Sequence, residues 1–201
     1  MAYVSRETWP ERALRRISRR SYTFQRESHA TRRSRAITYL SPLFAIVTGV
    51  VHAGLAPVIV IGGVKPNLVL VAVVLVTCLY GFLPGITWAF AAGLTANLLV
   101  GEPLGSVPLA MLIVAALVAG GGRLFGGLVW VYPILAAFAG SVLADVLGLA
   151  LFSIVAEPVR AGVPLQLILP AATLNAAIAA LLLYPARALT QRFVPEESGA
   201  W

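Results

Sequence analysis

The sequence predicts an all-α, polytopic integral membrane bundle of about six transmembrane helices, preceded by a basic N-terminal cytoplasmic tail. Hydrophobic residues make up 59% of the 201 residues and charged residues 11%, and the mean hydropathy is +0.88. A soluble domain carries about a quarter charged residues, so this chain cannot cover its own surface with polar groups and needs lipid. Apolar runs of membrane-spanning length recur after residue 36, and the net charge of +7 is confined to the residues before them.

Residues 1–36 form the predicted tail, with ten arginines against three glutamates; the five basic and five acidic residues after Ala36 balance. Thr8 and Glu11 match a capping box, and apolar residues then recur at spacings of three and four. This pattern is typical of a basic amphipathic helix lying on a lipid surface. The arginines expected to contact anionic lipids are Arg12, Arg15, Arg16, Arg19 and Arg20.

A second interpretation of the tail stays open, in which it is disordered and only sets the topology of the chain. Nucleic acid would be attracted by the same charge, but a tail tethered to a membrane makes that use less favoured. We therefore expect anionic lipids, and no nucleic acid, as the partner of the tail.

Six apolar runs follow, separated by breaks rich in glycine and proline. A helix needs about 20 apolar residues to cross the hydrocarbon core. The predicted spans are residues 37–56, 66–81, 84–100, 104–121, 128–156 and 164–189. The second and third are short and nearly continuous, which favours a tight hairpin. The fifth is longer than a bilayer needs, so we expect it to tilt, bend at Pro133 or project outward.

The charges between the spans predict the orientation of the chain. Lys and Arg favour the cytoplasmic side of a membrane, so the arginine-rich tail is expected inside. Six spans then place Arg123, Arg187 and Arg192 inside and leave only Lys65 and Arg160 outside. The expected domains are a cytoplasmic tail (1–36), a six-helix membrane domain (37–190) and a cytoplasmic C-terminal tail (191–201).

Small residues predict where the helices touch. Spans associate through small side chains that let backbones approach, and the third span has such a stripe at intervals of four. Its members are Gly85, Ala89, Gly93, Asn97 and Gly101, and the stripe continues to Pro103 and Gly105 in the following turn. We expect this set to form a helix-packing or partner interface.

Polar side chains at membrane depth are the other candidate functional residues. Asp145 is the costly one, because a central carboxylate costs about 2.5–3.5 kcal/mol on insertion scales. It either binds an ion, proton or substrate group, or forms a buried hydrogen bond between helices. Asn97 and Asn175 are expected to form interhelical hydrogen bonds, and His52 is expected near the membrane surface.

No catalytic constellation is evident in the sequence. We find no paired-carboxylate spacing, no histidine-rich metal motif, no nucleophile elbow and no phosphate loop. A single cysteine, Cys78, excludes an internal disulfide. We therefore expect no catalytic residues, no metal and no cofactor, and a protein that is not an enzyme.

Between Lys65 and Gly121 the sequence has an ordered pattern of proline, glycine and asparagine positions. Its members are Pro66-Asn67, Gly81, Gly85, Phe90, Gly93-Leu94, Asn97-Leu98-Leu99, Gly101 and Pro103-Leu104-Gly105. This pattern resembles the MreD family of rod shape-determining membrane proteins, which typically shows a Pro-polar pair opening a span, spaced glycines, a Gly-Leu-x-x-Asp segment and a following Pro-Leu-Gly turn. Two departures from the family are Asn97, where an Asp is usual, and the arginine-rich tail.

The resemblance implies a non-catalytic scaffold of the bacterial cell-elongation complex in the cytoplasmic membrane, acting in cell shape and peptidoglycan synthesis. Its implied partners are an MreC-like protein and the RodA/penicillin-binding synthase pair, with the actin-like MreB as a further partner. The alternative is a substrate-binding membrane subunit of an energy-coupling-factor type vitamin transporter, in which Asp145, Asn97 and Asn175 would line a pocket.

Overall fold

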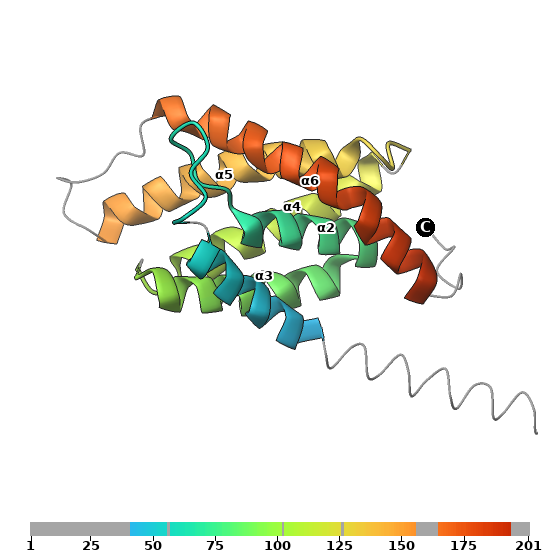
Figure 1. Ribbon diagram of the computed structural model, residues 1–201, viewed down its shortest axis with the longest axis horizontal. Helices are drawn as coiled ribbons and strands as arrows, with labels where there is room; N and C mark the ends of the chain where they lie inside the picture. Colours follow the sequence, from blue (N-terminus) through green and yellow to red (C-terminus); the bar gives the residue numbers. More distant parts are fainter. Residues whose placement is uncertain (1–40, 56, 102, 126, 156–164, 194–201) are drawn as a thin grey trace, which may run out of the picture. The chain divides into compact units, whose positions relative to one another are not determined.

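The computed structural model describes residues 41–55, 57–101, 103–125, 127–155 and 165–193. Within this part of the chain the regular structure is helical, apart from one β-bridge between Ile61 and Val64. The first helix, Ser41–Leu55, is followed by α2 (Leu68–Tyr80), α3 (Phe82–Val100), α4 (Ser106–Leu124), α5 (Tyr132–Val155) and α6 (Leu165–Phe193) (Figure 1). The predicted all-α class is thereby confirmed, while the basic tail lies outside the described residues.

Four of these helices are long and apolar enough to cross a membrane. They comprise α3, α4, the Tyr132–Leu151 part of α5 and the Gln166–Thr190 part of α6. The first helix and α2 are shorter. With 13 residues at about 1.5 Å each, α2 is about 20 Å long, against a hydrocarbon core of about 30 Å.

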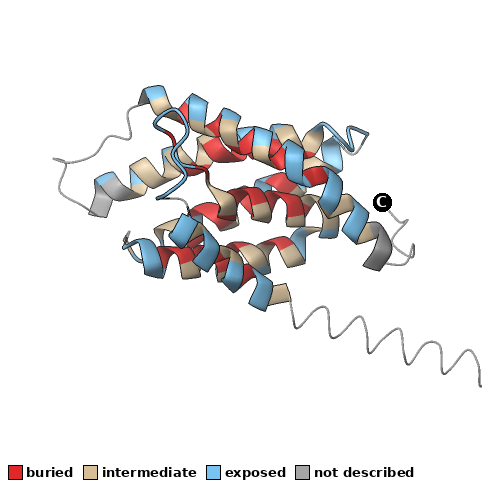
Figure 2. Cartoon of the chain, in the orientation of Figure 1, coloured by how far each residue is buried: buried red, intermediate tan, exposed pale blue. Residues whose placement is uncertain are grey.

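The short helix α2 lies in the centre of the bundle. Its sequence is apolar around its whole circumference, which is the pattern of a helix surrounded by protein. It contacts α3, α4, α5 and α6, and most of its length is buried (Figure 2). Leu70, Val73 and Val74 are buried completely. Because neighbouring helices surround α2, it does not have to match the thickness of the bilayer on its own.

Glycines allow α2 and α3 to form a hairpin with a single residue between them. Gly81 joins the two helices at a φ of 91°, in the left-handed region that glycine adopts without strain. Its N–H donates to the carbonyl of Thr77 at 3.0 Å. A Cβ at Gly85 would lie 2.2 Å from Oγ1 of Thr77, so only glycine lets the two backbones approach this closely.

The prolines of the last two helices lie in different positions. Pro133 is the second residue of α5, where the missing N–H would have had no helical partner, so it begins the helix and a bend there is not observed. Pro170 and Pro185 lie inside α6, where membrane helices tolerate proline because neighbouring groups satisfy the freed backbone carbonyls. The helix α6 packs mainly along α5 and continues past the predicted end at residue 189 to Phe193.

Candidate functional site

The small-residue stripe of α3 lies inside the bundle. Gly85, Ala89, Gly93 and Asn97 are all buried. A Cβ at Gly93 would lie 2.9 Å from Cα of Pro108 in α4, which is closer than real Cβ atoms pack. Gly85 therefore packs against α2 and Gly93 packs against α4. Both residues are buried in the bundle and do not form a surface for another protein.

Asn97 stabilises the turn between α3 and α4 through two hydrogen bonds. Its Oδ1 accepts a hydrogen bond from the N–H of Gly105 at 2.6 Å, and its Nδ2 donates to the carbonyl of Pro103 at 3.2 Å. Gly101 and Gly105 have φ values of 75° and 90°, so the turn needs glycine at both ends. An amide supplies one acceptor and one donor here, whereas an ionised Asp would supply acceptors only.

A second buried side-chain amide, that of Asn175, connects three helices through hydrogen bonds. Oδ1 of Asn175 in α6 accepts from the N–H of Asn67 at 2.8 Å, and Nδ2 donates to Oγ of Ser141 in α5 at 2.8 Å. Asn67 caps α2, because its Oδ1 accepts from the N–H of Leu70 at 3.0 Å. Asn175 thus forms the expected hydrogen bond between helices, whereas the bonds of Asn97 described above go to the turn after its own helix. Neither residue lines the cavity that contains Asp145.

Asp145 lines a cavity of about 340 Å³ together with polar residues from three other elements. His52 comes from the end of the first helix, Asn67 from the start of α2 and Ser106 from the start of α4. The rest of the lining is mainly apolar, contributed by α3, α4 and α5. We call this space the polar cavity.

Three of the polar groups around the polar cavity have no hydrogen-bond partner within the described part of the chain. They are Nδ1 of His52, Oγ of Ser106 and Oδ2 of Asp145, and all three atoms are buried. A buried polar atom without a partner costs about 1–3 kcal/mol. Only Asp145 was predicted as a site residue. Ser106 was missed because a serine at a helix start usually serves as a cap. His52 was expected near the membrane surface and was not linked to Asp145; it is half-buried within the bundle.

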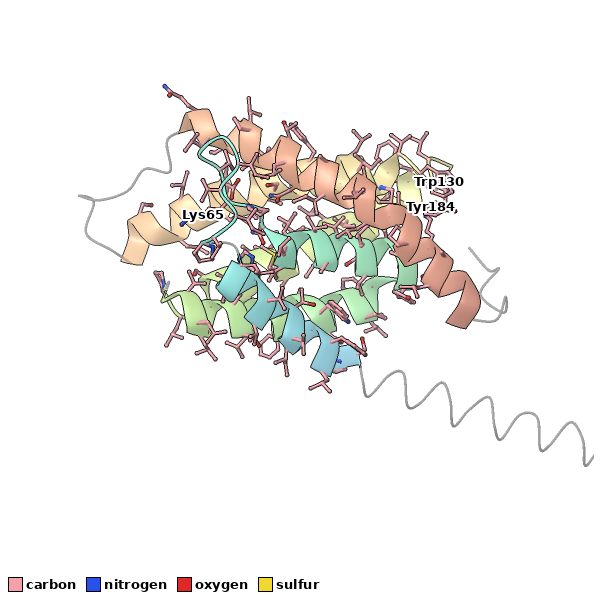
Figure 3. The ribbon with its side chains drawn as sticks, in the orientation of Figure 1. Lys65, Trp130 and Tyr184 are labelled. Atoms are coloured by element: carbon pink, nitrogen blue, oxygen red, sulfur yellow. The ribbon has the colours of Figure 1, made fainter. Side chains whose placement is uncertain are left out.

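The opposite end of the bundle carries a different group of residues. The guanidinium of Arg187 lies 4.2 Å from the centre of the Trp130 ring, and its Nη2 donates to the carbonyl of Val129. Tyr132 stacks with Phe125 and donates its hydroxyl proton to the carbonyl of Val118. Figure 3 shows Trp130 and Tyr184 at the end of the bundle remote from Lys65.

An apolar groove runs between α4 and α5. It has a volume of about 320 Å³ and is lined by residues that include Val114, Leu117, Leu135, Ala139 and Gly140. Leu117 and Leu135 are 59% and 55% exposed, so the groove opens on the outer surface of the bundle. We call it the α4–α5 groove.

Metal-binding clusters are not found within the described residues, where no three His, Cys, Asp or Glu side chains come together. The arginines predicted to contact lipid, Arg12, Arg15, Arg16, Arg19 and Arg20, lie outside these residues.

Comparison with known protein families finds a match. The family model for the rod shape-determining protein MreD matches residues 33–193, which is most of the chain and includes every described helix. Comparison with curated proteins and with solved structures finds no match.

Proposed function

The chain belongs to the MreD family of rod shape-determining membrane proteins, and we propose that it acts in the cell-elongation complex as a non-catalytic scaffold. The family match over residues 33–193 carries this proposal. The scaffold would bind an MreC-like protein and the RodA/penicillin-binding synthase pair, with MreB as a further partner. Its task would be to hold partner transmembrane helices in place, without an enzymatic step of its own.

We place the partner-binding surface at the α4–α5 groove. The stripe of α3 is occupied by packing inside the bundle, so a partner needs another surface with small residues. The groove offers the exposed Ala139 beside larger apolar side chains, and small residues allow two helices in lipid to approach closely. A transmembrane helix of the MreC-like partner is the occupant we propose.

Affinity purification in mild detergent tests this assignment. The wild-type chain should recover an MreC-like protein and cell-wall synthase components. Leu135→Trp would fill the groove and should reduce that recovery. Leu98→Trp is the matched control, because Leu98 is 62% exposed on α3 and lies away from the groove. Recovery of no cell-wall partner by the wild type would reject the scaffold, while equal recovery by both variants would reject only the groove.

The proposed arrangement in the bacterial cytoplasmic membrane has six spans with both termini cytoplasmic. The described basic residues support it: Lys65 lies between the first helix and α2, whereas Arg123 and Arg187 lie near the ends of α4 and α6. With the N-terminus inside, Lys65 is outside and the two arginines are inside, as the distribution of Lys and Arg in membrane proteins favours. The membrane domain would comprise residues 37–190, between the tails 1–36 and 191–201.

The tail is proposed to bind anionic lipids through Arg12, Arg15, Arg16, Arg19 and Arg20. Each basic residue near an anionic surface contributes about 1 kcal/mol. Deleting residues 1–26 should therefore weaken the association of the N-terminal region with anionic vesicles while leaving insertion intact. If the shortened chain inserts in reverse, the tail is a topology signal only.

A second candidate function is the substrate-binding subunit of an energy-coupling-factor type vitamin transporter. The polar cavity favours it, since Asp145 lines a space within the size range of small-ligand sites. Uptake measurements with Asp145→Ala distinguish the candidates: loss of vitamin uptake would support transport, and unchanged uptake with lost cell shape would support the scaffold.

A further inference from the structure

The polar cavity contains hydrogen-bond acceptors to which no described residue donates. Asp145, Ser106 and His52 come from three different helices, and each has a buried atom that no described residue satisfies. An ionised carboxylate only accepts hydrogen bonds, a hydroxyl oxygen accepts as well as donates, and a neutral imidazole has one accepting nitrogen. The three groups together therefore suit a ligand that donates several hydrogen bonds.

The charges of the residues around the polar cavity favour a positively charged ligand. Asp145 is the acidic side chain among the residues that line the polar cavity, and none of them is a lysine or arginine. Lys65, two residues before Asn67, is exposed and provides no partner for Oδ2 of Asp145. A carboxylate in this position has its charge uncompensated by the described residues, and uncompensated charges at membrane depth are costly.

We propose that the polar cavity binds a primary ammonium group, carried by an aminophospholipid headgroup or by a small free amine. An ammonium has three N–H donors and one positive charge, which matches three acceptor groups, one of them a carboxylate. A metal ion fits less well, because no three His, Cys, Asp or Glu side chains come together within the described residues. Apolar residues such as Val100, Met111 and Leu149 line the remaining wall and would contact the carbon chain next to the ammonium.

The location of the cavity agrees with an aminophospholipid. His52, Asn67 and Ser106 lie at helix ends on one side of the bundle, the end at which Figure 3 shows Lys65. Helix ends in a membrane protein lie near the headgroup region. The proposal goes beyond the scaffold function and does not require it, since it depends only on the residues that line the cavity.

The test compares headgroups that differ only in their N–H donors. The purified full-length chain is stripped of lipid in detergent and titrated with phosphatidylethanolamine or with phosphatidylcholine, whose trimethylated nitrogen has the same charge and no N–H group. Binding is measured by native mass spectrometry and by the shift in thermal unfolding. We expect phosphatidylethanolamine to bind about tenfold or more tightly than phosphatidylcholine, since hydrogen bonds to a charged group are among the stronger ones.

Variants assign the effect to the polar cavity. Asp145→Asn keeps the side-chain size but removes the charge and replaces one accepting oxygen with an NH₂ donor. The remaining hydrogen bonds to the ammonium should be fewer and weaker, so the preference for phosphatidylethanolamine should fall. Ser106→Ala should weaken the preference and provides the test should Asp145→Asn fail to fold. Ser153→Ala is the control, because Ser153 is an exposed residue of the same helix as Asp145 whose hydroxyl bonds to Ala150 of that helix.

A second arm separates the two sources of the ammonium. Free ethanolamine is compared with choline in detergent without phospholipid. Stabilisation by ethanolamine alone identifies a small amine as sufficient, and stabilisation by phosphatidylethanolamine only identifies the lipid; both outcomes support the ammonium site. Equal binding of the two phospholipids, or an unchanged preference in Asp145→Asn with intact folding, overturns it and leaves a cavity that holds only water. Partner recovery by the same variants is a separate measurement, so failure here leaves the scaffold untouched.

Discussion

At Gly93, a single added carbon atom, the Cβ of any other residue, would clash across the contact between α3 and α4. The nearest atom to a new Cβ would be a backbone atom, Cα of Pro108 at 2.9 Å, and a backbone atom cannot rotate away as the end of a side chain can. Gly93→Leu should therefore push α3 and α4 apart and destabilise the fold by about 1–3 kcal/mol. Thermal unfolding in detergent measures this loss.

The matched control is Gly120→Leu in α4. Gly120 is exposed, and a Cβ added there would have no neighbouring atom within 4 Å, so the same substitution should leave the unfolding temperature nearly unchanged. Equal losses in the two variants would mean that leucine at either position acts through something other than the contact with Pro108.

Asn97 stabilises the fold through hydrogen bonds instead of close approach. Asn97→Ala removes the acceptor for the N–H of Gly105 and the donor to the carbonyl of Pro103. A buried polar group without a partner costs about 1–3 kcal/mol, so we expect a loss of at least that size. Hydrogen exchange should show faster exchange of the Gly105 amide.

Thr87→Ala provides a comparison on the same helix. Thr87 is exposed, and its hydroxyl donates to the carbonyl of Leu83 within α3, so its removal should cost little. If Asn97→Ala proves no more harmful than Thr87→Ala, Asn97 does not hold the turn.

Between elements, the Asn175–Ser141 bond fixes α6 against α5. A double-mutant cycle with Asn175→Ala and Ser141→Ala should give a coupling energy of about 0.6 kcal/mol, with an upper bound of about 1.7 kcal/mol. Asn175→Ala should cost more than Ser141→Ala, because Asn175 also accepts from the N–H of Asn67. Unfolding of the four proteins in mixed micelles gives the energies.

The control cycle pairs Ser141→Ala with Thr173→Ala. Thr173 lies on α6 close to Asn175 in sequence, but it is exposed and donates to Leu169 of its own helix. Its effect should therefore add to that of Ser141→Ala. A coupling no larger for Asn175 than for Thr173 would show that the interhelical bond contributes nothing to stability.

Helix periodicity and glycine spacing were readable from the sequence because both depend on neighbouring residues. Apolar runs predicted the helices, and intervals of four placed Gly85 and Gly93 on one face of α3. The surroundings of Asp145 were not readable in this way. Ser106, His52 and Asn67 lie far from it in sequence, and only the packing of four elements brings them to one cavity.

For the same reason, the sequence did not reveal which apolar runs lie inside the bundle. The runs that form α2 and α3 are both hydrophobic, yet α2 is surrounded by four helices while α3 exposes Phe82, Phe90 and Leu98. Length did not separate them either, because the predicted spans 66–81 and 84–100 differ by one residue, whereas α2 has 13 residues and α3 has 19 in the structure.

At the scale of the whole molecule, the short helix α2 allows two paths of the chain through the membrane. If α2 and α3 both cross, the loop at Lys65 faces one side and the Gly81 junction faces the other. If they form a hairpin that enters and leaves on one side, the Gly81 junction lies within the membrane and does not reach the other side. Arg123, in the last turn of α4, provides the reference for the cytoplasmic side.

We predict that single cysteines at these positions divide between the two faces. In a Cys78→Ala background, a membrane-impermeant maleimide should label Lys65→Cys in intact spheroplasts, but Phe82→Cys and Arg123→Cys only after permeabilisation. All three residues are exposed on the bundle, so a difference in labelling does not come from burial within the protein. Labelling of Phe82→Cys from the outside would show that the hairpin does not cross, because a charged, impermeant reagent cannot pass the hydrocarbon core. In that case the six-span arrangement would have to be abandoned.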